Sequence, residues 1–216
     1  MSGSFLYPFL EAQERNAGPL LVDLAASADA KARGSTQLRA DTLQAEAEQL
    51  DKAAEALAGV FARDGRLLVI GNGGSSADAS AIASLFTSPP TGQPLPARSL
   101  VAEPAVLTAL ANDVGFEVVF ARQVSAHGRR GDALLGVSTS GGSANVLRAF
   151  RAARDVGMLT VGLAGYGGGA MGNSPDVQHC LAVGSDSVHR TQETQAAVVL
   201  ALWRRVQDLL GRRAPT

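Results

Sequence analysis

The sequence contains few of the residues on which covalent and metal chemistry depend. Of its 216 residues 1 is cysteine and 3 are histidine, and the only lysines, Lys31 and Lys52, precede the first strand-like segment. A single cysteine cannot form an internal disulfide bond, and no lysine stands at a strand end where it could form a Schiff base. The histidines also lack the spacing that zinc-binding helices show. We therefore expect no dedicated metal site.

The chain also lacks a strong net charge and a long apolar run. Its 19 basic and 20 acidic residues give a formal net charge of -1, which provides no electrostatic argument for a nucleic acid or an acidic membrane as partner. No apolar run approaches the ~20 residues of a membrane span, and no signal-peptide pattern is visible. We expect a soluble cytoplasmic protein that binds a small molecule or another protein, without nucleic acid or membrane.

The first 65 residues are rich in alanine and in charged residues. Their apolar residues recur every three or four positions, as on one face of a helix. The clearest run is Leu43, Ala47, Leu50, Ala54, Leu57 and Phe61. We predict an N-terminal helical region over residues 1–65, packed on the core or on partner subunits, and a single α/β domain over residues 66–216.

After residue 65, short apolar segments alternate with helical stretches. The predicted strands span 66–70, 98–101, 133–137, 158–163 and 177–183. Strands that alternate with helices are typical of a doubly wound parallel sheet with helices on both faces. With the common strand order 2-1-3-4-5, the first and third strands lie side by side, and their following loops face one crevice.

Two loops rich in glycine and serine follow these two strands, GNGGSS at 71–76 and STSGGS at 138–143. Glycine lets the backbone approach a ligand, while serine hydroxyls and the free amides of a helix N-terminus can donate hydrogen bonds to an anion. Ser75 and Asp78 also have capping-box spacing, which predicts that Ser75 caps the following helix. Each loop alone is equally consistent with ordinary turn chemistry, but the matched pair favours a ligand site.

The residues around the glycines indicate the type of anion. A P-loop requires a lysine, and none follows here. A dinucleotide site is a stronger rival because GNGGSS resembles a degraded G-x-G-x-x-G. However, Glu103 lies 32 residues after Gly71, farther than the usual distance of about 20. A dinucleotide would also leave the second loop unexplained, whereas several hydroxyl groups suit a small phosphate monoester.

Four motifs occur in order along the chain: GNGGSSADA at 71–79, LTALANDVGF at 107–116, GDALLGVSTSGGSANVLRA at 131–149 and RTQE at 190–193. Together they closely resemble the SIS (sugar isomerase) domain family, and within it the phosphoheptose isomerase branch. The resemblance implies an SIS fold, a homotetramer with sites at subunit contacts, and interconversion of sedoheptulose 7-phosphate with a heptose 7-phosphate.

The resemblance also implies roles for individual residues. The sugar is expected to contact the first loop and residues of two helices: Asn72, Gly73, Gly74, Ser75, Asn112, Asp113 and Gln192. The phosphate is expected at the second loop: Ser138, Thr139, Ser140 and Ser143. All of these residue types can donate or accept hydrogen bonds through side chain or backbone.

The metal ligands of the family's zinc-dependent branch are not matched. Where that branch has a histidine and a glutamate on the helix after the first loop, this sequence has Ala81 and Leu85. Where it has a histidine on the last helix, this sequence has Leu200, so only Gln192 remains of four expected ligands. Apolar side chains neither coordinate zinc nor transfer protons. We expect no zinc and no other cofactor.

Two functions remain open on these observations. If the protein isomerises a sugar phosphate, proton transfer through an enediol requires a carboxylate or histidine beside the sugar, and His189 and Glu193 flank Gln192, with Asp113 behind them. Glu193 and Asp113 have structural alternatives as a helix-dipole partner and a loop cap. The second function is a non-catalytic phosphosugar sensor or protein-binding scaffold, as in relatives that associate with a replication initiator.

Overall fold

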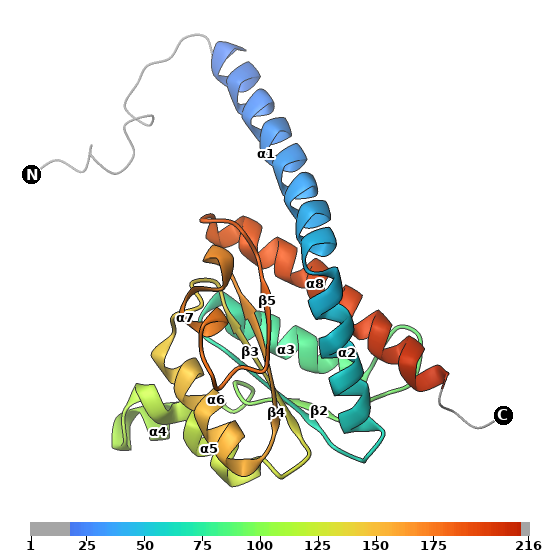
Figure 1. The fold of residues 1–216 in the computed structure, drawn as a ribbon. Coiled ribbons are helices and arrows are strands. Elements are labelled where there is room, and N and C mark those ends of the chain that lie inside the picture. Colours follow the sequence, from blue (N-terminus) through green and yellow to red (C-terminus); the bar gives the residue numbers. More distant parts are fainter. Residues whose placement is uncertain (1–17, 213–216) are drawn as a thin grey trace, which may run out of the picture. The chain divides into compact units, whose positions relative to one another are not determined.

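The computed structural model describes residues 18–212 (Figure 1). Helix α1 spans Gly18–Ala45 and helix α2 spans Ala47–Phe61. The chain forms two compact units that divide between Gln37 and Leu38. This division lies within α1, whereas the sequence places a boundary after residue 65. Any helix expected before residue 18, and the tail after residue 212, lie outside the described residues.

Helix α2 belongs to the second unit because it contributes to that unit's core. Its residues Leu50, Ala53 and Leu57 are fully buried in the same apolar cluster as the sheet. Burial of this face stabilises the helix on the sheet, since each large apolar side chain removed from water contributes roughly 1.5–3 kcal/mol. Helix α2 therefore completes the core of the second unit.

The sheet has five parallel strands: β1 Leu67–Gly71, β2 Ala97–Ser99, β3 Ala133–Ser138, β4 Leu159–Ala164 and β5 His179–Ala182. Their order is β2-β1-β3-β4-β5, with every neighbouring pair parallel. The predicted α/β class, five-stranded doubly wound sheet and strand order 2-1-3-4-5 are confirmed. Strands β1 and β3 are buried along their whole length, as expected where helices cover both faces of a parallel sheet.

Helices cover both faces of the sheet (Figure 1). Together with α2, one face carries α3 Gly74–Thr87 and α8 Val188–Gly211, whose apolar residues form one cluster with alternate strand residues. The second cluster lies on the other face and includes α5 Val119–His127 and α6 Ala144–Val156, with α4 Pro104–Asp113 packed at its edge. The remaining short helices are η3 Phe116–Val118, η4 Tyr166–Gly168 and α7 Gly169–Gly172. Among the helices of residues 18–212, none has both the length and the apolar character of a membrane span.

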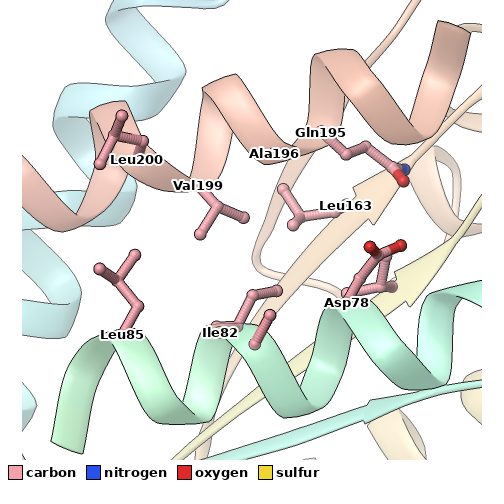
Figure 2. Close-up of a pocket in the computed structure, with 10 residues that line it drawn as sticks. Asp78, Ile82, Leu85, Leu163, Gln195, Ala196, Val199 and Leu200 are labelled. Carbon is pink, nitrogen blue, oxygen red and sulfur yellow. The ribbon is translucent and has the colours of Figure 1, made fainter. Parts of the chain in front are cut away.

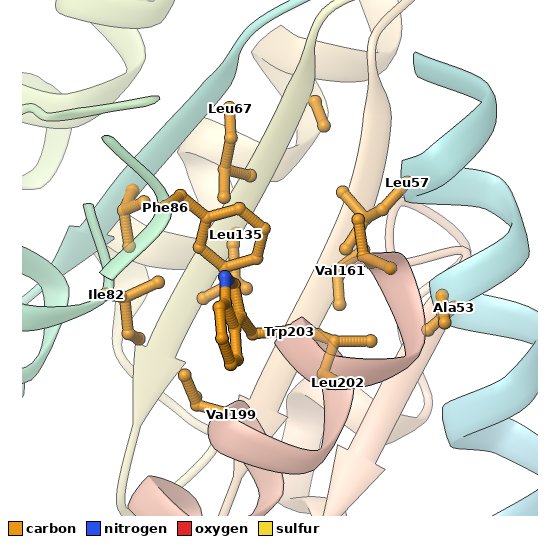
Figure 3. Packing of buried hydrophobic residues seen from close by; sticks show 14 of the residues in the cluster. Ala53, Leu57, Leu67, Ile82, Phe86, Leu135, Val161, Val199, Leu202 and Trp203 are labelled. Atoms are coloured by element: carbon orange, nitrogen blue, oxygen red, sulfur yellow. The ribbon is translucent and has the colours of Figure 1, made fainter. Parts of the chain in front are cut away.

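The first cluster centres on the last helix. Figure 3 shows Trp203 of α8 beside Phe86 and Ile82 of α3 and above Leu135 of β3. Trp203 is 4% exposed, so this large side chain fixes α8 against both α3 and the sheet. The C-terminal half of the last helix is therefore held firmly on α3 and on the sheet.

An ion pair joins β1 and β3 at the edge of the sheet where both strands begin. This edge is opposite the one that carries the two loops. The Asp132 carboxylate accepts hydrogen bonds from the Arg66 backbone N–H at 2.9 Å and from Arg66 Nη2 at 2.7 Å. It also accepts one from the Arg129 backbone N–H at 3.1 Å. The Asp132 side chain is 4% exposed, so water cannot replace these bonds without local opening.

Replacing Asp132 with alanine tests this clamp. We expect Asp132→Ala to lower the free energy of unfolding by about 3 kcal/mol, because two backbone donors and a guanidinium lose their acceptor. Glu117→Ala is the matched control, since Glu117 pairs with Arg148 where both side chains are more than half exposed, and it should cost less than ~1 kcal/mol. Urea unfolding of the two variants measures the difference, and equal losses would contradict the buried clamp.

Candidate functional site

The two loops meet where β1 and β3 end. The register pairs Gly71 of β1 with Val137 of β3, so both strands end at the same level and their loops emerge side by side. Asn72 and Asn145 then join the loops through a reciprocal pair of amide hydrogen bonds. Asn72 Nδ2 donates to Asn145 Oδ1 at 2.8 Å, and Asn145 Nδ2 donates to Asn72 Oδ1 at 2.9 Å. Asn145 is 3% exposed, so this link is shielded from competing water.

The first loop turns at Gly73. Its φ of +53° lies in the region that favours glycine, and a Cβ atom there would meet nothing within 4 Å, so the backbone faces open space. Gly74 is required for a different reason: a Cβ atom there would lie 2.5 Å from Gln192 Nε2. The glycines thus permit an open backbone at one position and close approach of the last helix at the next.

The predicted capping box at Ser75 and Asp78 is wrong. Helix α3 begins at Gly74 with Gly73 as its N-cap, and no side chain caps it. The positive φ of Gly73 starts the helix before Ser75, which is therefore a buried residue of the first turn. Asp78 instead accepts a hydrogen bond from Gln192 Nε2 at 3.0 Å, which ties α3 to α8.

The second loop gathers three hydroxyl groups at the start of α6. The Oγ atom of Ser138 lies 3.0 Å from that of Ser143 and 3.4 Å from that of Ser140. Ser143 is the N-cap residue of α6, but its side chain makes no capping bond, so this hydroxyl is not used by the helix. Thr139 lies between them and is half-buried. Hydroxyl groups and unpaired amides at a helix N-terminus suit a phosphate group.

A glycine-rich segment, residues 165–169, packs against the second loop. A Cβ atom on Gly141 would lie 2.4 Å from the Gly168 carbonyl oxygen, and the Met171 N–H donates to the Gly141 carbonyl at 2.8 Å. Tyr166 of this segment has a φ of +49°, and its hydroxyl donates to the Asp186 carbonyl at 2.9 Å. This segment was not predicted as part of the site, although its run of glycines was a signal for close backbone contact.

The other candidate residues are less closely connected. Within residues 18–212, no hydrogen bond joins His189 or Glu193 of α8 to another side chain, and both are exposed. Asn112 and Asp113 are exposed at the end of α4, where Asn112 Nδ2 donates to Asp113 Oδ1 at 2.9 Å. The structure therefore brings together the two loops and Gln192, and leaves these four side chains at the surface, where Asn112 and Asp113 bond only to each other among the described residues.

Two groups with a shifted pKa, Cys180 and His179, lie on β5, away from the loops. Burial raises the pKa of the Cys180 thiol to about 11, with a further contribution from the charge of Glu46. Burial, and then the charge of Lys52, lowers the pKa of His179. Cys180 is thus a protonated thiol at neutral pH and no nucleophile.

A pocket of about 260 Å³ lies between α3 and α8 (Figure 2). We call it the α3–α8 pocket. Ala81 and Leu85 of α3 and Leu200 of α8 form part of its wall, together with other apolar side chains. Its polar lining residues are Asp78 and Gln195. Among the described residues, no group of three or more His, Cys, Asp or Glu side chains is placed to hold a metal ion.

Comparison with known proteins relates this geometry to a family. The model of the SIS domain matches residues 32–165, more than half of the chain. This chain belongs to the SIS-domain family. A phosphoheptose isomerase of Roseiflexus sp. (strain RS-1) is 45% identical over 166 residues, which are 76% of this chain and 83% of that protein. The phosphoheptose isomerase branch predicted from the motifs is thereby confirmed.

Two solved structures of SIS-domain proteins share the fold. Phosphoheptose isomerase of Neisseria gonorrhoeae has a TM-score of 0.80 and 34% identity, covering 86% of this chain and 99% of that one. A phosphoheptose isomerase from Francisella tularensis has a TM-score of 0.79 and 32% identity, covering 85% and 98%. The predicted SIS fold is thus confirmed.

Asn145→Ala tests the link between the two loops. We expect a loss of about 1–2 kcal/mol in the free energy of unfolding, because the Asn72 side-chain amide loses the partner that it has among residues 18–212, and faster amide hydrogen exchange at residues 72–76. Asn173→Ala is the control, since Asn173 is exposed and bonds only to the nearby Gly169 carbonyl. Unchanged exchange at residues 72–76 in Asn145→Ala would show that the link does not order the first loop.

Proposed function

We propose that this protein binds a phosphorylated sugar where its two loops converge. The observation that carries the proposal is the cluster of Ser138, Ser140 and Ser143 hydroxyls at the start of α6, joined to the first loop by Asn72 and Asn145. A phosphate monoester needs several neutral donors around three oxygens, and this cluster supplies them. Names of the relatives support the same class of ligand, since they are phosphoheptose isomerases.

Each candidate residue has a part in this proposal. Ser138, Thr139, Ser140 and Ser143 hold the phosphate. Asn72, Gly73, Gly74, Ser75 and Gln192 contact the sugar from the first loop and from α8. Asn112 and Asp113 add contacts from α4, where they are exposed and available to a ligand. By resemblance to the family, we also propose a homotetramer with sites at subunit contacts.

The residues present do not fit the zinc ion of the family's metal-dependent branch. Ala81, Leu85 and Leu200 face the α3–α8 pocket, and none of them has an atom that coordinates zinc. Gln192 already donates a hydrogen bond to Asp78. These residues therefore offer no zinc-based route for proton transfer.

Two candidate functions follow from phosphosugar binding. The first is ketose–aldose isomerisation of a sugar phosphate such as sedoheptulose 7-phosphate, with His189 or Glu193 moving the proton; the preserved loop geometry favours it. The second is a sensor or scaffold that binds the sugar phosphate, and through it another protein, without turnover. The apolar side chains at 81, 85 and 200 and the exposure of His189 and Glu193 favour the second candidate.

Substituting two serines tests the phosphate site. Sedoheptulose 7-phosphate at 100 times its dissociation constant should stabilise the unchanged protein by about 2.7 kcal/mol, a shift of several degrees in Tm. We expect Ser140→Ala with Ser143→Ala to abolish this shift because two donors to the phosphate are removed. Ser125→Ala, on the exposed side of α5, should keep it. A full shift in the double variant would overturn the site assignment.

Proton exchange at C2 of the bound sugar distinguishes the two candidates. In deuterated water, an isomerase exchanges this proton through the enediol even when the net reaction is slow. Metal-free catalysis predicts exchange that persists with a chelator and falls at least about 100-fold in Glu193→Gln or in His189→Gln, the magnitude typical of a lost general base. A sensor predicts no exchange for any heptose or hexose phosphate that binds, with or without added zinc.

A further inference from the structure

The α3–α8 pocket has a polar end and an apolar end. Helices α3 and α8 both begin at the loop edge of the sheet and run back across its face. Asp78 and Gln195 therefore lie nearer the loops, and Leu85 and Leu200 lie farther from them, as Figure 2 shows. A ligand held by the loops would meet polar groups first and apolar side chains beyond them.

The polar end of the pocket contains an unused hydrogen-bonding group. Gln195 is 2% exposed, and neither its Nε2 nor its Oε1 atom has a hydrogen-bond partner among residues 18–212. In Figure 2 its amide points toward the Asp78 carboxylate. Burying an amide without a partner is unfavourable, so a ligand that offers a donor and an acceptor here would gain from both.

The apolar end of the pocket is incompletely covered. Leu200 is 38% exposed, and it faces Leu85 of α3 across the pocket, with Val199 of α8 beside it. Contact with an apolar group would remove these side chains from water, which is the main source of affinity for such ligands. At about 260 Å³ the pocket is larger than the ~150 Å³ cavity that accepts benzene, so a group of about six carbons fits.

We infer that the α3–α8 pocket binds an apolar group at the end of the ligand far from its phosphate, with a hydroxyl or amide beside that group bonded to Gln195. This rests on the proposed function, because the phosphate must occupy the serine loop. Within the sugar phosphates of the proposed function, the ligand favoured is then one that carries an apolar group at the end far from its phosphate. Ala81, Leu85 and Leu200 line this pocket with apolar side chains. They stand at the positions where the resemblance places metal ligands in the zinc-dependent branch of the family.

A series of n-alkyl phosphates from methyl to octyl tests the inference by titration calorimetry. Once the alkyl group of the ligand is long enough to reach the pocket, each further methylene should tighten binding about fourfold. Ala81→Leu fills the pocket and should remove this dependence while leaving the affinity for methyl phosphate within about twofold. Ala126→Leu, an exposed alanine of α5, should behave like the unchanged protein.

The outcomes separate this inference from the proposed function. Equal affinity for methyl and octyl phosphate in the unchanged protein would overturn the apolar pocket while phosphate binding stands. If the affinity of Ala81→Leu still rises with the length of the alkyl group, the apolar pocket is overturned as well, since the alkyl group would then bind elsewhere. If neither inorganic phosphate nor any ester binds, the proposed function fails and this inference with it.

Discussion

The parallel pairing of β1 with β3 is the contact on which the candidate site depends. It brings together two loops that are 67 residues apart in the chain, because Gly71 and Val137 share one register position. Asp132 and Arg66 hold the pair where the strands begin, and Asn72 and Asn145 hold it where they end. The loops therefore face one another at a fixed separation, and their donors can act on one ligand.

The candidate site has two parts: the two loops, whose motifs match the family, and positions 81, 85 and 200, whose residues differ from those of its zinc-dependent branch. Loop donors come largely from backbone amides and serine hydroxyls, which the strand–helix turns provide as part of their own geometry. Ala81, Leu85 and Leu200 differ from the buried core residues of α3 and α8 because none of the three is fully buried, so the fold places a weaker constraint on their chemistry. The fold therefore constrains the two loops more strongly than it constrains the side chains at positions 81, 85 and 200.

The fold was predictable because its signals are local. Apolar runs followed by glycine and a helical stretch identified all five strands, and the parallel order followed from the alternation. The helix start near Ser75 was mispredicted because the positive φ of Gly73 outweighs a weak capping pattern. The core contacts of α2 are tertiary, and no local feature of residues 47–61 shows what they pack against. Whether the candidate sugar contacts at Asn112, Asp113, His189 and Glu193 bind a ligand stays a prediction.

Local composition and order along the chain were sufficient for the α/β class, the two donor-rich loops and the absence of metal-binding side chains at 81, 85 and 200. Each of these is a property of a residue and its near neighbours. The Asn72–Asn145 link, the bond from Gln192 to Asp78 and the unpaired amide of Gln195 are properties of the folded chain alone. They join residues that are 73 and 114 positions apart, or depend on burial, and only packing of the helices on the sheet determines which of these groups meet.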